Sequence, residues 1–146
     1  MNVVAMLIAA LLFVPLLAAG LAHLGWSVGL NWPIRDPQLL ARTVVGTPGI
    51  LRMPPKPLTF LVSLAILATG VLALSLADHS SGGLWLDLLG IAAGIALLAR
   101  GGAGYTQGWR QRFPTEPFAS YDRKLYTPLI LAIGLGFIVL VVMRHI

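Results

Sequence analysis

Four long apolar segments alternate with short polar ones along the chain. A helix that crosses a bilayer needs about 20 consecutive, mostly apolar residues, and each segment meets or nearly meets that length. The last segment is slightly short, so we expect residues upstream of Thr127 to extend it by an aromatic-rich turn. The pattern predicts an all-α fold, a four-helix transmembrane bundle, in a single domain covering residues 1–146. The predicted spans are residues 3–30, 58–77, 84–100 and 127–143.

The first apolar segment is predicted to stay in the mature protein as a span. A secretory signal peptide begins with Lys or Arg, whereas the first basic residue here is Arg35. Pro15 removes one backbone hydrogen bond in mid-span and is expected to kink the helix. Small residues at helical spacing then mark faces where two helices can approach closely. These are Ala18, Ala22, Gly25 and Gly29; Ala65, Thr69, Ala73 and Ala77; Gly90 and Gly94; and Ala132 and Gly136.

The first connection, residues 31–57, contains six prolines, which exclude a long helix. A short amphipathic interfacial helix is predicted from Pro37 to Val45. Asp36 is a suitable N-cap, Pro37 suits the first helical position and Gly46 suits the end. We expect Leu40 and Val44 to form its lipid-facing side.

The second connection, Asp78 to Gly83, is short enough to predict a tight reversal, with the second and third spans forming an antiparallel hairpin. The third connection starts at Arg100 and holds a glycine-rich run, residues 101–104. The simplest interpretation of that run is a helix end that needs backbone freedom. A phosphate-binding loop is disfavoured because no strand precedes the run and no Gly-Lys-Ser/Thr follows it.

Composition supports the membrane interpretation. Hydrophobic residues make up 58% of the 146 residues and charged residues 10%, far below the roughly 25% of soluble domains. The net charge of +5 is spread beside the apolar spans, so anionic lipid head groups are the expected counter-charge and nucleic acid is not. The chain has no cysteine, which excludes disulfides, thiol catalysis and cysteine-ligated metals.

Lys and Arg are distributed unevenly between the connections. The first connection has four, the third has five and the tail has Arg144, while the N-terminus and the second connection have none. By the positive-inside rule the first and third connections are cytoplasmic and both termini face outward. We therefore expect a multi-pass protein of the cell inner membrane.

Three stretches of the chain carry a resemblance: HLGWS from His23, RTVVGTPGILRMPPKPLT from Arg42 and the long run that starts at Leu98. They resemble a family of small bacterial four-span membrane proteins known as a domain of unknown function. The recurring elements match His23 and Trp26, Phe118 and Asp122, and Tyr126, Thr127, Pro128 and Leu129. Where similar proteins often have cysteine, this chain has Ile130. The resemblance implies the fold and a membrane location, and it implies no activity.

His23 is the leading candidate for a functional side chain. It lies near the cytoplasmic end of the first span and should face the bundle or the head groups, because an ionisable group facing lipid is costly. There it could meet Asp122 or Tyr126, which would give an imidazole suited to proton transfer. The alternative is that His23 and Trp26 are interfacial anchors. Candidate ligand-binding residues at the same depth are Trp26, Arg42, Arg100 and Tyr105.

We expect no metal and no cofactor. An outer metal site from Asp78, His79, Asp87 and His145 is conceivable, but no ligand spacing supports it. Asp87 can instead pair with Arg144, or turn to water from the first helical turn.

Two functional hypotheses remain from the sequence. The leading one is a non-enzymatic accessory or structural subunit of a membrane assembly, because small-residue faces occur on more helices than one bundle must bury. Its partners would be the bilayer and other membrane protein subunits. The alternative is a membrane-embedded enzyme or binder of a lipid-like ligand, with its site at the cytoplasmic interface around His23. The sequence leaves open whether the protein is an enzyme.

Overall fold

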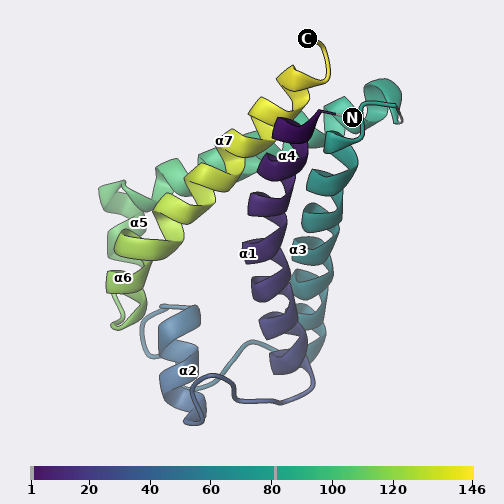
Figure 1. Ribbon diagram of the computed structural model, residues 1–146. Helices are drawn as coiled ribbons and strands as arrows, with labels where there is room; N and C mark the ends of the chain where they lie inside the picture. The colour runs from purple at the N-terminus through teal and green to yellow at the C-terminus, as the bar shows by residue number, and fades with distance from the viewer. Residues whose placement is uncertain (1, 81) are drawn as a thin grey trace.

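The computed structural model describes residues 2–80 and 82–146, and all regular structure in these ranges is helical (Figure 1). The elements are α1 (Val3–Ser27), α2 (Pro37–Val44), α3 (Lys56–Ala77), α4 (Gly83–Gly104), α5 (Gln107–Arg112), α6 (Phe118–Tyr121), the π-helical turn η1 (Asp122–Tyr126) and α7 (Thr127–Met143). The last three form one continuous helix, Phe118–Met143. This helix and α1, α3 and α4 are each long and apolar enough to cross a membrane, as expected for a multi-pass membrane protein.

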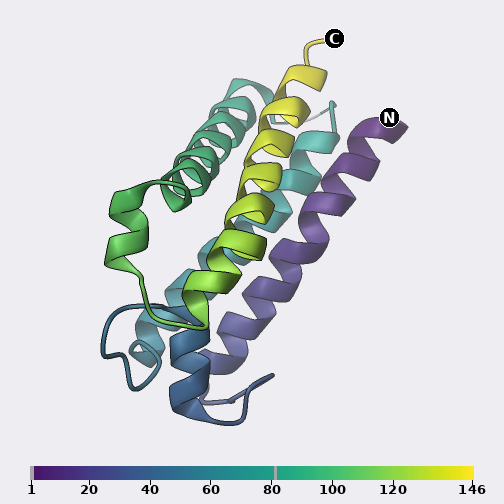
Figure 2. The ribbon, with the colours of Figure 1, turned by 90° about the vertical axis from the view of Figure 1, so that its left-hand side faces the viewer.

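The four long helices pack as two pairs. α1 lies along α3, and α4 lies along α7, with smaller contacts between the pairs (Figures 1 and 2). Both chain ends and the α3–α4 connection lie at one end of the bundle, which we call the terminal end. The helices α2, α5 and α6 lie at the other, which we call the α2 end. The four-helix bundle is therefore confirmed, with a cap of short helices at one end.

The hydrophobic core lies mainly toward the terminal end. It joins side chains from the first half of α1 to the last turns of α3 and α7, among them Leu12, Leu76 and Phe137. Leu76 and Phe137 are completely buried. Toward the α2 end the α4/α7 pair leans away from the α1/α3 pair (Figure 1). The pairs thus meet at the terminal end and separate at the α2 end.

Glycines bring the helices within each pair close together. A Cβ atom on Gly134 of α7 would lie 2.9 Å from the backbone nitrogen of Leu98 on α4. In the other pair, the buried hydroxyl of Ser63 donates a 2.8 Å hydrogen bond to the carbonyl of Gly20. The glycine-rich run has the same role, because Gly101 and Gly104 are buried against Leu131 and Thr127 of α7. The run forms the last turn of α4, as the prediction of a helix end required, but none of its glycines has a positive φ.

The predicted small-residue faces are used in part. Ala73, Ala77, Gly90 and Gly94 are buried, as expected. Ala65, Ala18 and Ala132 are exposed. α1 buries instead a face that begins with Ala5 and Ala9 and continues through Leu12, Leu16 and Gly20. In helices this rich in alanine and glycine, small residues recur on several faces, so spacing does not show which face meets a helix.

The short helix in the first connection is confirmed. Asp36 caps α2 by accepting hydrogen bonds from the backbone nitrogens of Gln38 and Leu39, at 2.8 and 3.1 Å. Gly46 follows its end with φ +73°, a left-handed conformation that suits glycine, and a side chain there would clash with Phe118. The expectation that Leu40 faces lipid is wrong. Leu40 is 1% exposed because the cap turns this side of α2 toward the protein.

The predicted span limits are close, with two corrections. α1 ends at Ser27 rather than residue 30, and α4 continues to Gly104. The extension upstream of Thr127 is confirmed, because Thr127 lies inside the continuous helix Phe118–Met143. α3 and α4 are joined by a short reversal as predicted, but each packs mainly against another helix. Ser81, part of that reversal, lies outside the described residues.

Candidate functional site

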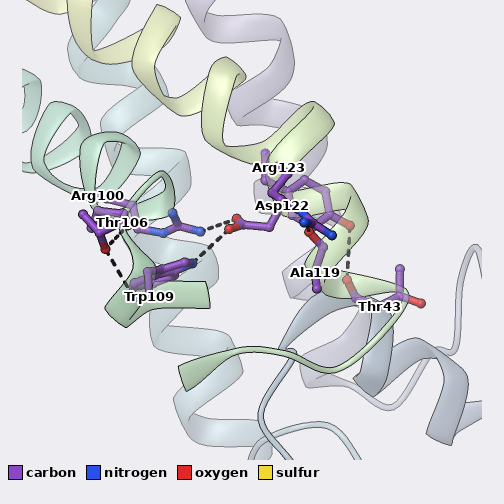
Figure 3. A network of polar contacts seen from close by, with 9 residues as sticks. Thr43, Arg100, Thr106, Trp109, Ala119, Asp122 and Arg123 are labelled. Carbon is purple, nitrogen blue, oxygen red and sulfur yellow. Dashed lines mark hydrogen bonds and ion pairs between the residues drawn. The ribbon is translucent and has the colours of Figure 1, made fainter. Parts of the chain in front are cut away.

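A buried polar cluster joins α4, α5 and η1 at the α2 end. Asp122, which is 3% exposed, accepts a hydrogen bond on each carboxylate oxygen. Arg100 Nη2 donates to Oδ1 at 2.7 Å and Trp109 Nε1 donates to Oδ2 at 2.9 Å. Figure 3 shows both side chains pointing toward Asp122 from α4 and α5. The carboxylate is thus fully engaged by a charged donor and a neutral one, which suits burial.

The π-helical turn explains how Asp122 reaches α4. Thr127, five residues later, is completely buried and lies against Gly104 of α4. In an α-helix of 3.6 residues per turn, positions five apart point in different directions. A π turn closes between residues five apart and brings them to nearly the same side. The backbone N–H of Thr127 bonds to the carbonyl of Asp122 in this way, so both side chains face α4.

α5 places Trp109 over the arginine. Thr106 caps this helix by accepting from the backbone nitrogen of Trp109, at 3.3 Å. The Arg100 guanidinium carbon then lies 4.0 Å from the centre of the Trp109 ring. This distance is well within cation–π range. Trp109 therefore contacts both members of the ion pair, Arg100 through its ring and Asp122 through its Nε1 hydrogen bond.

A cavity of about 390 Å³, the central cavity, lies between the two helix pairs where they separate. Its walls are largely apolar, with residues from α1, α3, α4 and α7. It extends from Pro15, at the middle of α1, to His23 and Trp26 near its end. Eight residues of helix separate Pro15 from His23, about 12 Å at 1.5 Å per residue. The polar lining side chains are His23, Trp26, Arg100 and Tyr126.

A second cavity of about 340 Å³, the side cavity, adjoins the first beneath the cap. Both cavities are lined by His23, Val44, Arg100 and Phe118. In the side cavity the remaining walls come from the first connection, α3 and the aromatic side chains of Trp109 and Phe113. The volumes fall in the usual range for small-molecule sites.

Two hydrogen bonds hold the cap over these cavities. Tyr126 donates its hydroxyl to the carbonyl of Thr43 in α2, at 3.2 Å. Thr115 donates to the carbonyl of Thr47, at 3.1 Å. The first connection, which contains α2, is therefore attached to the α4/α7 side of the bundle, although it directly precedes α3 in the chain.

His23 contributes one free acceptor. Its Nδ1 lies 2.8 Å from the carbonyl of Ala19, and a carbonyl only accepts, so Nδ1 carries the proton. In the neutral ring, Nε2 is then an acceptor. The ring also packs against Trp26, with centroids 4.7 Å apart. The anticipated pairing with Asp122 does not occur, because Arg100 and Trp109 occupy that carboxylate. His23 does share the central cavity with Tyr126.

Arg100 has an unsatisfied donor. Its Nη1 atom is buried and has no acceptor among the described residues. A buried donor without a partner costs about 1–3 kcal/mol. Arg100 lines both cavities, and Nη2, its other terminal nitrogen, is the one that binds Asp122.

The structure brings together four of the seven candidate residues at the central cavity: His23, Trp26, Arg100 and Tyr126. Asp122 lies behind Arg100, and Arg42 and Tyr105 are exposed away from both cavities. Sequence reasoning missed Trp109, Phe118 and Val44 as lining or positioning residues. A partial signal for α5, which carries Trp109, was present, because threonine is a favoured N-cap residue and Thr106 directly precedes this helix.

No group of three or more metal-ligating side chains occurs in the described part of the chain. At the terminal end, Asp87 instead binds Arg144, whose Nε donates to Oδ1 at 2.6 Å. His145 Nε2 lies 3.2 Å from the other oxygen. The anticipated Asp87–Arg144 pair is confirmed.

A family model described as a protein of unknown function (DUF3995) matches residues 16–137. The chain belongs to this family. The match covers the cap, the Asp122 cluster and every lining residue of the central cavity except Pro15. It leaves out the first turns of α1 and the last turns of α7. No curated protein and no solved structure matches the chain. The DUF3995 protein is thus a chain with four membrane-spanning-type helices, and its family description names no activity.

Proposed function

We propose that this DUF3995 protein binds one lipid-like molecule in the central cavity. The apolar part of the ligand lies along α1 between Pro15 and His23, and its polar end lies beside His23 and Arg100. One observation carries the proposal: an apolar cavity that opens between helix pairs has polar side chains at one end only. Such a distribution matches a molecule with an apolar chain and a small polar head.

We further propose an inner-membrane location with the α2 end in the cytoplasm. Nine of the ten Lys and Arg residues belong to the two connections at that end, and Arg144 is at the other. The positive-inside rule then gives outward-facing termini. In this orientation the polar end of the cavity lies at the cytoplasmic surface, where Trp26 is a typical interfacial residue.

Single-cysteine labelling tests this orientation, because the chain contains no cysteine of its own. We expect Ser80→Cys to react with an impermeant maleimide added to intact cells, and Gln111→Cys to react only after the membrane is opened. Both positions are exposed, so access depends on the side of the membrane. The opposite pattern would invert the orientation.

Filling the cavity tests the binding proposal. Ala19 lines the central cavity, and Ala19→Trp should displace a bound molecule without removing a polar contact. Ala10→Trp is the matched control, because Ala10 is exposed on the same helix and lines neither cavity. After purification in mild detergent, native mass spectrometry should find a lipid-sized adduct on the parent and on Ala10→Trp, reduced at least fivefold on Ala19→Trp. Equal adducts on all three would contradict the proposal.

A second candidate, the accessory subunit, is favoured by an unused groove on α1. Ala18, Ala22 and Gly25 line a groove of about 320 Å³ on the outer side of this helix, together with Trp26 and Trp32. Small residues of this kind allow close helix contact in membranes. The same native mass measurement counts protein subunits. A particle that contains only one chain would argue against this candidate.

A further inference from the structure

We infer that the ligand's head group is uncharged and carries an oxygen that accepts a hydrogen bond from Arg100. This inference rests on the proposed function and adds the chemical class of the head. It follows from the charge balance around the two cavities and from the unsatisfied donor of Arg100.

Arg100 is the only Lys, Arg, Asp or Glu among the described residues that line either cavity. Its charge is already compensated, because Asp122 lies 2.7 Å away with a side chain 4% exposed. An anionic head would place a second negative charge on the same guanidinium. The result would be a net negative charge in a largely apolar site, and burying such a charge is costly.

An uncharged oxygen avoids this cost and still has a partner. Among the residues that the structure describes, Nη1 of Arg100 is the one guanidinium nitrogen that is buried without an acceptor. A carbonyl or hydroxyl oxygen from either cavity could accept from it and leave the Arg100–Asp122 pair intact. A hydroxyl could also donate to Nε2 of His23, whose other ring nitrogen donates to Ala19. His23 would thereby distinguish a hydroxyl head from a carbonyl head.

Three probes with the same hydrocarbon chain test the inference: oleyl alcohol, methyl oleate and oleate. Binding to the delipidated full-length protein is measured by native mass spectrometry at neutral pH. We expect the alcohol and the ester to bind at least tenfold more tightly than oleate. Tighter binding of oleate would overturn the uncharged-head inference while preserving the proposed function. Failure of all three to bind, with no adduct on the parent, would overturn both.

Two variants identify the groups responsible. Asp122→Asn keeps an acceptor for Trp109 but leaves the charge of Arg100 uncompensated, so it should improve oleate binding relative to the alcohol at least tenfold. Unchanged preference in the folded variant would contradict the charge argument. His23→Ala should weaken oleyl alcohol severalfold and leave methyl oleate unaffected. Equal weakening of both would contradict the role of Nε2. If Asp122→Asn does not fold, the parent's preference still decides the inference.

Discussion

Arg144→Ala is expected to destabilise the protein by about 3–5 kcal/mol, the usual cost of breaking a buried ion pair. The Arg144 side chain is 6% exposed and that of Asp87 is 10% exposed. Arg144 also donates from Nη1 to the carbonyl of Asp78, at 2.7 Å. One side chain therefore joins the end of α7 to the start of α4 and the end of α3. Its loss leaves the Asp87 carboxylate buried without its closest charged partner.

The measurement is thermal unfolding in mild detergent, with His145→Ala as control. His145 also approaches Asp87, at 3.2 Å, but its side chain is 64% exposed. Exposed pairs contribute between about 0 and 1 kcal/mol, so this variant should unfold close to the parent. If the two variants lost equal stability, the burial of Arg144 would not be the cause.

The Asp87–Arg144 pair was predictable because the predicted spans determine how deep each residue lies in the membrane. Once hydropathy assigns four helices, the start of the third and the end of the fourth must lie at the same end of the bundle. One acid and one arginine occur in those turns, so few pairings were available. The same depth argument placed His23, Arg100 and Tyr126 at one level, and they line one cavity.

The partner of Asp122 was not predictable from depth. Several polar candidates, among them His23 and Arg100, are expected at similar depth, and the direction of the Asp122 side chain decides which of them it meets. That direction depends on η1, whose extra residue per turn rotates Asp122 toward α4. Nothing in the sequence DRKLY distinguishes a π turn from an α turn. The position of α5, which brings Trp109 to the same carboxylate, was likewise not predicted.

The central cavity could not be predicted from the sequence either, because its position depends on which helices pack as pairs. Small-residue spacing predicted close contacts on all four spans but not their partners. α4 contacts α7 through Gly94, Gly101 and Gly134, whereas α1 contacts α3 through Gly20. Separate pairs can lean apart at one end, and this leaves space that a uniformly packed bundle would not have.

Asp122→Ala is expected to destabilise the protein by about 3 kcal/mol, at the lower end of the range for a buried ion pair. The lower value follows because the Arg100 side chain is 27% exposed and can reach some solvent. The substitution removes the acceptor of both Arg100 Nη2 and Trp109 Nε1. α5 then loses its polar attachment to the continuous helix, which should be seen in both the unfolding temperature and tryptophan fluorescence.

Glu116→Ala is the control for this substitution. Glu116 is an acid in the same connection, but it pairs with Arg123 at 3.7 Å and both side chains are about half exposed. Its removal should change stability by less than about 1 kcal/mol.

The double variant Arg100→Met with Asp122→Leu should be more stable than Asp122→Ala, because it leaves no buried charge unpaired. That double variant should also lose the preference for an uncharged oxygen-bearing head, since Arg100 supplies the donor. A double variant no more stable than Asp122→Ala would show that packing around Asp122, rather than the unpaired guanidinium, causes the loss.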